Sequence, residues 1–132
     1  MSARARNTKK GRGGAQFVML GEWLQKSEAW ATMRPGPRAL YVELRRRFTG
    51  TNNGDIFLSQ RDAAKALNVS KDTANAYFRD LAARRFIEVT QGGHLGPSRI
   101  GQAAKWALTE EHLNGRPPSK GFMAWRENKT PS

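Results

Sequence analysis

Residues 58–87, LSQRDAAKALNVSKDTANAYFRDLAARRFI, contain two helical patterns that are separated by a break of only three residues. The first pattern starts after Ser59, a residue type that caps helix N-termini, and ends at Leu67. The second starts after Ser70 and has Asp72 in its first turn, where the helix dipole favours a carboxylate. Two helices joined by so short a break are typical of a helix-turn-helix.

The apolar spacing predicts which face of the second helix is buried. Ala74, Phe78 and Leu81 are separated by four and three residues, so they share one side of a helix. Asn68 follows the first helix directly, and Asn is second only to Gly in the left-handed conformation that a sharp turn needs there. Val69 is placed to fill the angle between the two helices. The stretch therefore has the turn chemistry of a helix-turn-helix as well as its periodicity.

This stretch resembles the helix-turn-helix of bacterial winged-helix regulators, in which a small residue, then Leu-Gly-Val-Ser, Thr-Val and a final Gly-Phe-Ile recur at fixed spacing. The matching positions here are Ala64, Leu67, Asn68, Val69, Ser70, Thr73, Ala74, Phe78, Leu81, Phe86 and Ile87. Three positions depart from the pattern: Asn68 and Arg85 replace glycines, and Ala76 replaces an arginine that often clamps a phosphate in the family. The resemblance implies that another basic residue, Arg79 or Lys71, makes that contact.

The resemblance implies a winged helix-turn-helix fold, mainly α with a small β-hairpin wing. The wider chain also resembles, more loosely, small winged-helix proteins carried on bacterial plasmids, phages and integrative elements. We expect a basic, disordered arm at 1–15, a DNA-binding domain at 16–108, and an extended C-terminal tail at 109–132 that is partly docked on the core. In the tail, Phe122 and Trp125 are the expected docking residues.

The remaining elements follow from local signals. Residues 17–33 predict one or two short helices with a break at Ser27, and Pro37 suits the first turn of a helix ending near Phe48. The short apolar run at residues 56–58 predicts an edge strand. Strands at 86–89 and 103–108 would flank a glycine-rich wing at 90–102, although the alanines of the second strand leave a helix open there.

Charge points to a polyanionic partner. The formal net charge is +12 over 132 residues. Five basic residues lie in the N-terminal arm, which contains no acid: Arg4, Arg6, Lys9, Lys10 and Arg12. A membrane surface would call for a free amphipathic helix, and here the apolar faces are needed for the core. Double-stranded DNA is the expected partner, and the arm either lies along a groove or only adds general charge.

The residues needed for catalysis or metal binding do not form a recognisable pattern. The chain has no cysteine, and its only histidines, His94 and His112, lack metal-ligand spacing. The glycine-rich segment lacks the Lys-Ser/Thr ending of a phosphate-binding loop. No apolar run reaches the roughly 18–20 residues of a membrane span. We therefore expect no enzyme, no metal or cofactor, no small-molecule ligand and no membrane, but a bacterial cytoplasmic protein associated with the nucleoid.

In a helix-turn-helix the second helix, here 70–84, lies in the major groove with its N-terminal residues on base edges. The side chains expected to face or flank the groove are Ser70, Lys71, Asp72, Thr73, Asn75, Ala76 and Arg79. Asn75 is the expected specificity residue, because an amide can pair with the N6 and N7 positions of adenine. Arg99 of the wing is expected to enter a minor groove or hold a phosphate.

The sequence favours a sequence-specific DNA-binding protein, most simply a transcriptional regulator that acts by occupying its site. Two alternatives stay open. One is a module for plasmid or phage replication or partition, and the other is a winged-helix adaptor that binds an acidic protein. Whether the chain forms a homodimer also stays open, since no long heptad helix offers a seam.

Overall fold

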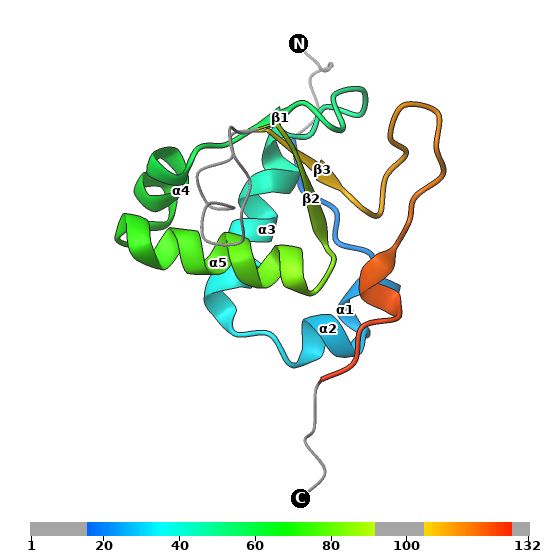
Figure 1. Cartoon of the computed structure of the whole chain (residues 1–132), viewed down its shortest axis with the longest axis horizontal. Helices are drawn as coiled ribbons and strands as arrows, with labels where there is room; N and C mark the ends of the chain where they lie inside the picture. The colour runs from blue at the N-terminus through cyan, green and yellow to red at the C-terminus, as the bar shows by residue number, and fades with distance from the viewer. Residues whose placement is uncertain (1–15, 92–104, 128–132) are drawn as a thin grey trace, which may run out of the picture.

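A computed structural model of the protein describes residues 16–91 and 105–127 (Figure 1). In chain order the elements are α1 (Glu22–Gln25), α2 (Glu28–Ala31), α3 (Pro35–Arg47), β1 (Ile56–Phe57), α4 (Gln60–Leu67), α5 (Lys71–Ala83), β2 (Ile87–Gln91), β3 (Lys105–Leu108) and the 3-10 helix η2 (Gly121–Met123). No helix in these two ranges is long and apolar enough to cross a membrane.

Helices α3, α4 and α5 pack together, and α3 contacts both of the others. The predicted face of α5 is confirmed, because Ala74, Phe78 and Leu81 have no exposed surface. From α3, Leu40 and Leu44 are buried against this face in the same core. The 3.6-residue period thus identified the packing side of the helix correctly.

A three-stranded antiparallel sheet covers the helices, with the strand order β1-β3-β2. Ile56 of β1 and Val89 of β2 both lie opposite Trp106 of the central strand. The expected class holds in its coarser form: this is a mixed α/β fold in which the packed helices α3, α4 and α5 are followed by the β2-β3 hairpin, and the expected edge strand β1 joins that hairpin as a third strand. The alanine-rich segment forms a strand in its described part, Lys105–Leu108, where Trp106 points into the core.

The N-terminal part forms two four-residue helices, with Ser27 at the predicted break. The Ser27 hydroxyl caps α2 by accepting a hydrogen bond from the Trp30 amide at 3.2 Å. So short a helix is not stable by itself. Two arginines bond to its carbonyls: Arg38 of α3 donates to the Trp30 carbonyl at 2.8 Å, and Arg84, the C-cap residue of α5, donates to the Ala29 carbonyl at 2.8 Å.

The C-terminal segment returns to the N-terminal helices. Phe122 is fully buried, with its ring stacked on Trp23 at 5.4 Å and on Phe86 at 4.7 Å between centroids. The Arg84 guanidinium lies 4.4 Å over the Trp125 ring. The sequence did not predict the 3-10 turn of η2, which is what delivers Phe122 to this position.

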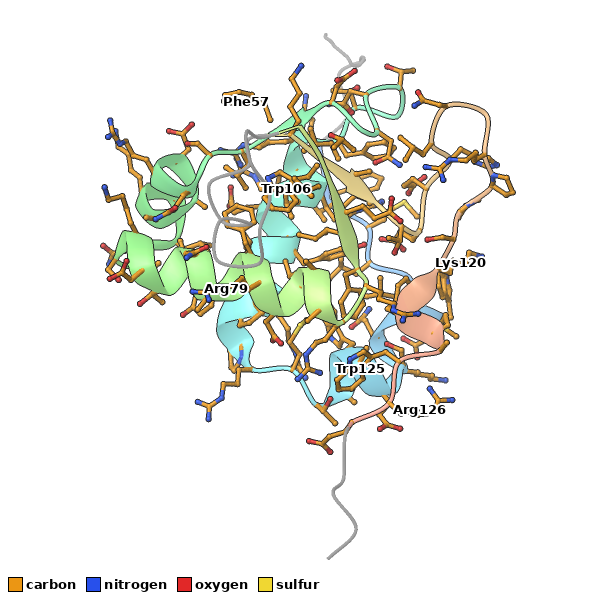
Figure 2. All side chains as sticks on the ribbon, viewed as in Figure 1. Phe57, Arg79, Trp106, Lys120, Trp125 and Arg126 are labelled. Atoms are coloured by element: carbon orange, nitrogen blue, oxygen red, sulfur yellow. The ribbon has the colours of Figure 1, made fainter. Side chains whose placement is uncertain are left out.

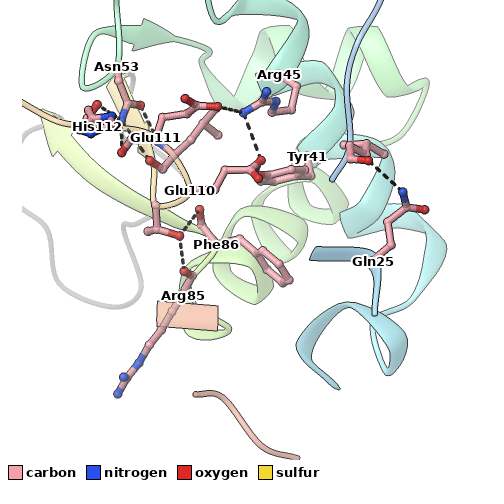
Figure 3. A network of polar contacts seen from close by, with 12 residues as sticks. Gln25, Tyr41, Arg45, Asn53, Arg85, Phe86, Glu110, Glu111 and His112 are labelled. Carbon is pink, nitrogen blue, oxygen red and sulfur yellow. Dashed lines mark hydrogen bonds and ion pairs between the residues drawn. The ribbon is translucent and has the colours of Figure 1, made fainter. Parts of the chain in front are cut away.

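A polar network joins α3 to the segment that follows β3 (Figure 3). The Tyr41 hydroxyl donates to the Glu110 carboxylate, and Arg45 forms ion pairs with Glu110 at 3.1 Å and Glu111 at 2.8 Å. The Asn53 side chain accepts from the Leu108 amide at 2.7 Å and donates to the Leu108 carbonyl at 3.0 Å, as a neighbouring strand would. Burial, followed by the charge of Glu110, raises the pKa of the Tyr41 phenol well above its usual value.

We predict that this phenol makes stability fall at high pH. An unfolded tyrosine loses its proton near pH 10, whereas the folded protein keeps it, so the contribution is complete below about pH 10 and is lost as the pH rises through the raised pKa. Denaturant midpoints measured between about pH 8 and pH 11 should fall more steeply for the parent than for Tyr41→Phe. Parallel profiles for the two proteins would contradict a phenol that is held neutral by the fold.

Candidate nucleic-acid interface

Local hydrogen bonds fix the unit made of α4, the turn 68–70 and α5, which we call the two-helix unit. The Ser59 hydroxyl accepts from the Asp62 amide at 3.0 Å at the start of α4. Asn68 ends α4 in the left-handed region, with φ 58° and ψ 49°, as its sequence position predicts. The Ser70 hydroxyl then accepts from the Thr73 amide at 3.1 Å and so starts α5. Each of these contacts is local, which explains why the sequence alone indicated the turn.

The candidate residues of the two-helix unit fall into two groups. Lys71, Asp72, Ala76 and Arg79 have exposed side chains on one side of α5, together with Ser70 at its N-cap. Thr73 and Asn75 are half-buried. The hydroxyls of Ser70 and Thr73 bond to each other at 2.9 Å, so in this structure they serve the cap of the helix.

Asn75 has an unusual environment for a residue expected to read a base. Its Oδ1 atom is buried and has no hydrogen-bond partner in the structure, whose described part is 16–91 and 105–127. A buried carbonyl oxygen without a donor costs about 1–3 kcal/mol. The predicted specificity role therefore requires the amide to turn before Oδ1 can meet a ligand.

Four exposed cations lie on the two-helix unit. Arg61, Lys65, Lys71 and Arg79 are exposed and form no ion pair with another described residue. By contrast, seven cations on other surfaces or at the end of α5 are paired with carboxylates: Lys26, Arg45, Arg46, Arg47, Arg84, Lys105 and Arg126. Arg34, Arg85, Arg116 and Lys120 are also exposed without an ion pair to a described residue, so the two-helix unit carries four of the eight such cations in the described chain.

Two of these cations, Arg61 and Lys65, were not among the residues predicted from the sequence. They lie four residues apart on α4, so they share a side of that helix. The signal was present in the sequence as an i, i+4 pair of basic residues on the first helix. The helix-turn-helix pattern assigns base reading to the second helix, so it does not single out this pair.

Two residues that depart from the family pattern have structural consequences. Ala76 is exposed, so the position of the usual arginine presents only a methyl group. Arg85 takes a left-handed conformation with φ 67°, at the position where the pattern of winged-helix regulators has glycine. At position 36 of α3 the Tyr77 ring of α5 fills the space of a side chain: a Cβ there would lie 2.2 Å from Cζ, so a larger residue would displace this ring.

Several predicted contacts lie outside the described residues. These are Arg99 and most of the wing, and the arm residues Arg4, Arg6, Lys9, Lys10 and Arg12. Of the two histidines, His94 is also outside, and His112 is an exposed residue whose carbonyl accepts from Asn53 at 2.9 Å. Within the described ranges no three His, Asp or Glu side chains gather as metal ligands would.

Comparisons with protein-family models, with curated proteins and with solved structures find no match to this chain. Its function must therefore be inferred from the residues and from their arrangement.

The backbone angle at Asn68 yields a stability prediction. Asn68→Ala should lower the free energy of unfolding by about 1 kcal/mol, because alanine tolerates the left-handed region poorly, whereas Asn68→Gly should be close to neutral. By the same reasoning Arg85→Gly should raise stability. Urea denaturation of the three variants measures these differences. An equal loss in Asn68→Gly and Asn68→Ala would mean that the amide side chain, and not the backbone angle, is what matters at this position.

Proposed function

We propose that the protein binds double-stranded DNA in a sequence-specific manner, with α5 in the major groove. The observation that carries this proposal is the set of four exposed cations on the two-helix unit that form no ion pair with a described residue, next to the exposed side of α5. A helix placed in a major groove presents its N-terminal residues to base edges, while surrounding cations neutralise phosphates.

The order of the elements supports the same proposal. Three packed helices followed by an antiparallel pair of strands is the order found in winged helix-turn-helix proteins, and here it is α3, α4, α5, β2 and β3. In that arrangement the connection between β2 and β3 would be the wing. A transcriptional regulator and a replication or partition module would both bind DNA through this contact. We favour the regulator, because it needs only that the protein occupies its site.

The spacing of two exposed cations suits the groove. Lys71 and Arg79 are eight residues apart on α5, which is about 12 Å along the axis at 1.5 Å per residue. A helix that lies in the major groove carries cations at this spacing to different points along it. We therefore assign Lys71, in the first turn, to a guanine or a nearby phosphate, and Arg79 to a phosphate farther along the groove.

The half-buried Asn75 would act when DNA is bound. A rotation of its amide would bring Oδ1 outward, where the N6 amine of adenine would supply the donor that the oxygen lacks in the free protein. The same rotation places Nδ2 toward N7 of that base. Asp72 could accept from a cytosine amine, and Ala76 could contact a thymine methyl group.

We predict that Arg79→Ala weakens DNA binding for all sequences and reduces the dependence of log K on log salt by about one unit. Arg126→Ala is the charge-matched control, because Arg126 lies beside Trp125 on the C-terminal segment, away from α4 (Figure 2). Titration of a labelled duplex at several salt concentrations measures both slopes. Equal slopes for the two variants would place the phosphate contacts elsewhere.

Selection from a random pool of duplexes tests specific reading. We expect a defined motif for the parent and the loss of preference at one adenine for Asn75→Ala, with a cost of about 1–3 kcal/mol. Arg79→Ala should bind the parent motif more weakly but with unchanged preferences, which separates a base contact from a phosphate contact. If the selected pool contained no motif, charge alone would explain the binding, and the proposal of a sequence-specific regulator would be wrong.

A further inference from the structure

Two exposed cations lie beside exposed apolar side chains around η2. The Lys120 Nζ lies 4.6 Å over the centroid of the Trp23 ring, and Trp23 is 38% exposed. Arg85 packs its aliphatic stem on Gly121, where a Cβ would lie 3.0 Å from the Arg85 Cβ. Met123, which is 42% exposed, lies one 3-10 turn after Lys120, and its amide donates to the Lys120 carbonyl at 2.9 Å. We call Trp23, Arg85, Lys120 and Met123 the η2 surface.

The backbone holds the two cations near each other. The Thr109 hydroxyl donates to the Arg85 carbonyl at 2.8 Å, and the Thr109 carbonyl accepts from the Lys120 amide at 2.9 Å. Arg85 and Lys120 both take left-handed conformations, with φ 67° and φ 50°. A residue with a side chain takes this conformation at a cost of about 1–2 kcal/mol, so the surrounding contacts must fix both positions.

The positive charge of the η2 surface is not compensated within the chain. Neither cation forms an ion pair with another described residue, although both are exposed. The segments outside the described ranges, 1–15, 92–104 and 128–132, contain no Asp or Glu that could supply a side-chain carboxylate. The carboxylates of α1 and α2, Glu22 and Glu28, pair instead with Lys26 at 3.6 Å and with Arg126 at 3.7 Å. A carboxylate from another molecule would therefore meet unopposed positive charge here.

We propose that the η2 surface binds an acidic segment of a partner protein. Carboxylates of that segment pair with Lys120 and Arg85. An apolar side chain next to them packs on Trp23 and Met123. Apolar burial supplies most of the affinity in such a contact, while the charges select an acidic partner and orient it. The thioether of Met123 is flexible, which suits a surface that accepts more than one apolar side chain.

The rings around η2 favour a protein partner over a nucleic acid. A single strand of nucleic acid gains much of its affinity from bases that stack on open aromatic faces. Here the Trp23 ring is contacted by Phe122 and by Lys120, and the Arg84 guanidinium lies over the Trp125 ring. Figure 2 shows Lys120 on the other side of the molecule from Arg79. The η2 surface can therefore take its partner whether or not DNA is bound at α5.

Selection of short random peptides displayed on phage, with the full chain as the target, tests the proposal. We expect enriched peptides in which Asp or Glu adjoins an aromatic or aliphatic residue. Lys120→Gly should weaken their binding about tenfold, and it keeps the fold because glycine accepts the left-handed backbone. Arg79→Ala is the matched control, since it removes one charge from α5 and should leave peptide binding unchanged. A pool without acidic peptides, or an equal loss in the two variants, would overturn the proposal.

A second pair of variants tests the apolar part of the contact. Met123→Glu places a carboxylate beside the two cations and should abolish binding of the selected peptides. Phe57→Glu introduces the same charge at a residue that is 57% exposed in the edge strand β1, and it should leave peptide binding unchanged. Equal losses in these two variants would mean that overall charge, and not the η2 surface, determines the binding.

Titration with nucleic acid separates this proposal from the proposed DNA contact. Lys120→Gly should bind a labelled duplex as the parent does, whereas Arg79→Ala should bind it more weakly. If Lys120→Gly weakened duplex binding as much as Arg79→Ala, the η2 surface would belong to the DNA contact and the proposal would be wrong. Binding of a short single-stranded oligonucleotide that is lost in Lys120→Gly and kept in Arg79→Ala would assign the surface to nucleic acid instead.

Discussion

Trp106 lies in the central strand of the sheet and contacts the helical layer and both neighbouring strands. Its ring stacks on Phe78 of α5, with 4.7 Å between centroids and 9° between planes, and its Nε1 donates to the Leu58 carbonyl at 3.1 Å. Its backbone pairs with Ile56 on one side and Val89 on the other. The orientation of α5 relative to the sheet, and the entry of the chain into α4, both depend on this one buried side chain. The exposed side of α5 is consequently backed by a buried pair of stacked rings.

Much of the fold could be predicted because its signals are local. The caps at Ser59 and Ser70 and the left-handed Asn68 each act over three or four residues, so the sequence displays them directly. The buried face of α5 follows from helical spacing alone. The edge strand at β1 was also expected. Its pairing with β3 could not be predicted, because a strand of two residues carries no signal for its partner.

The contacts that could not be predicted join distant parts of the chain. The Asn53 amide substitutes for a strand edge at Leu108, 55 residues away, and nothing near Asn53 in the sequence distinguishes it from other loop asparagines. The pairing of Tyr41 with Glu110 is similarly remote. In the candidate site, the exposure of Lys71 and Arg79 could be predicted, because helical spacing places them away from the buried residues of α5. The half-burial of Asn75 could not be inferred, because it depends on how neighbouring elements cover that side of the helix.

The stacking of Phe122 on Trp23 and Phe86 also determines the order in which the protein can be completed during synthesis. Glu28 accepts a hydrogen bond from the amide of Glu127, 99 residues later, so the contacts that secure the N-terminal helices have very large sequence separation. The two-helix unit needs only neighbouring residues and can form early, whereas α1 and α2 lack their cover until residue 122 has left the ribosome. During that interval the faces of Trp23 and Phe86 on which Phe122 stacks stay uncovered on the nascent chain.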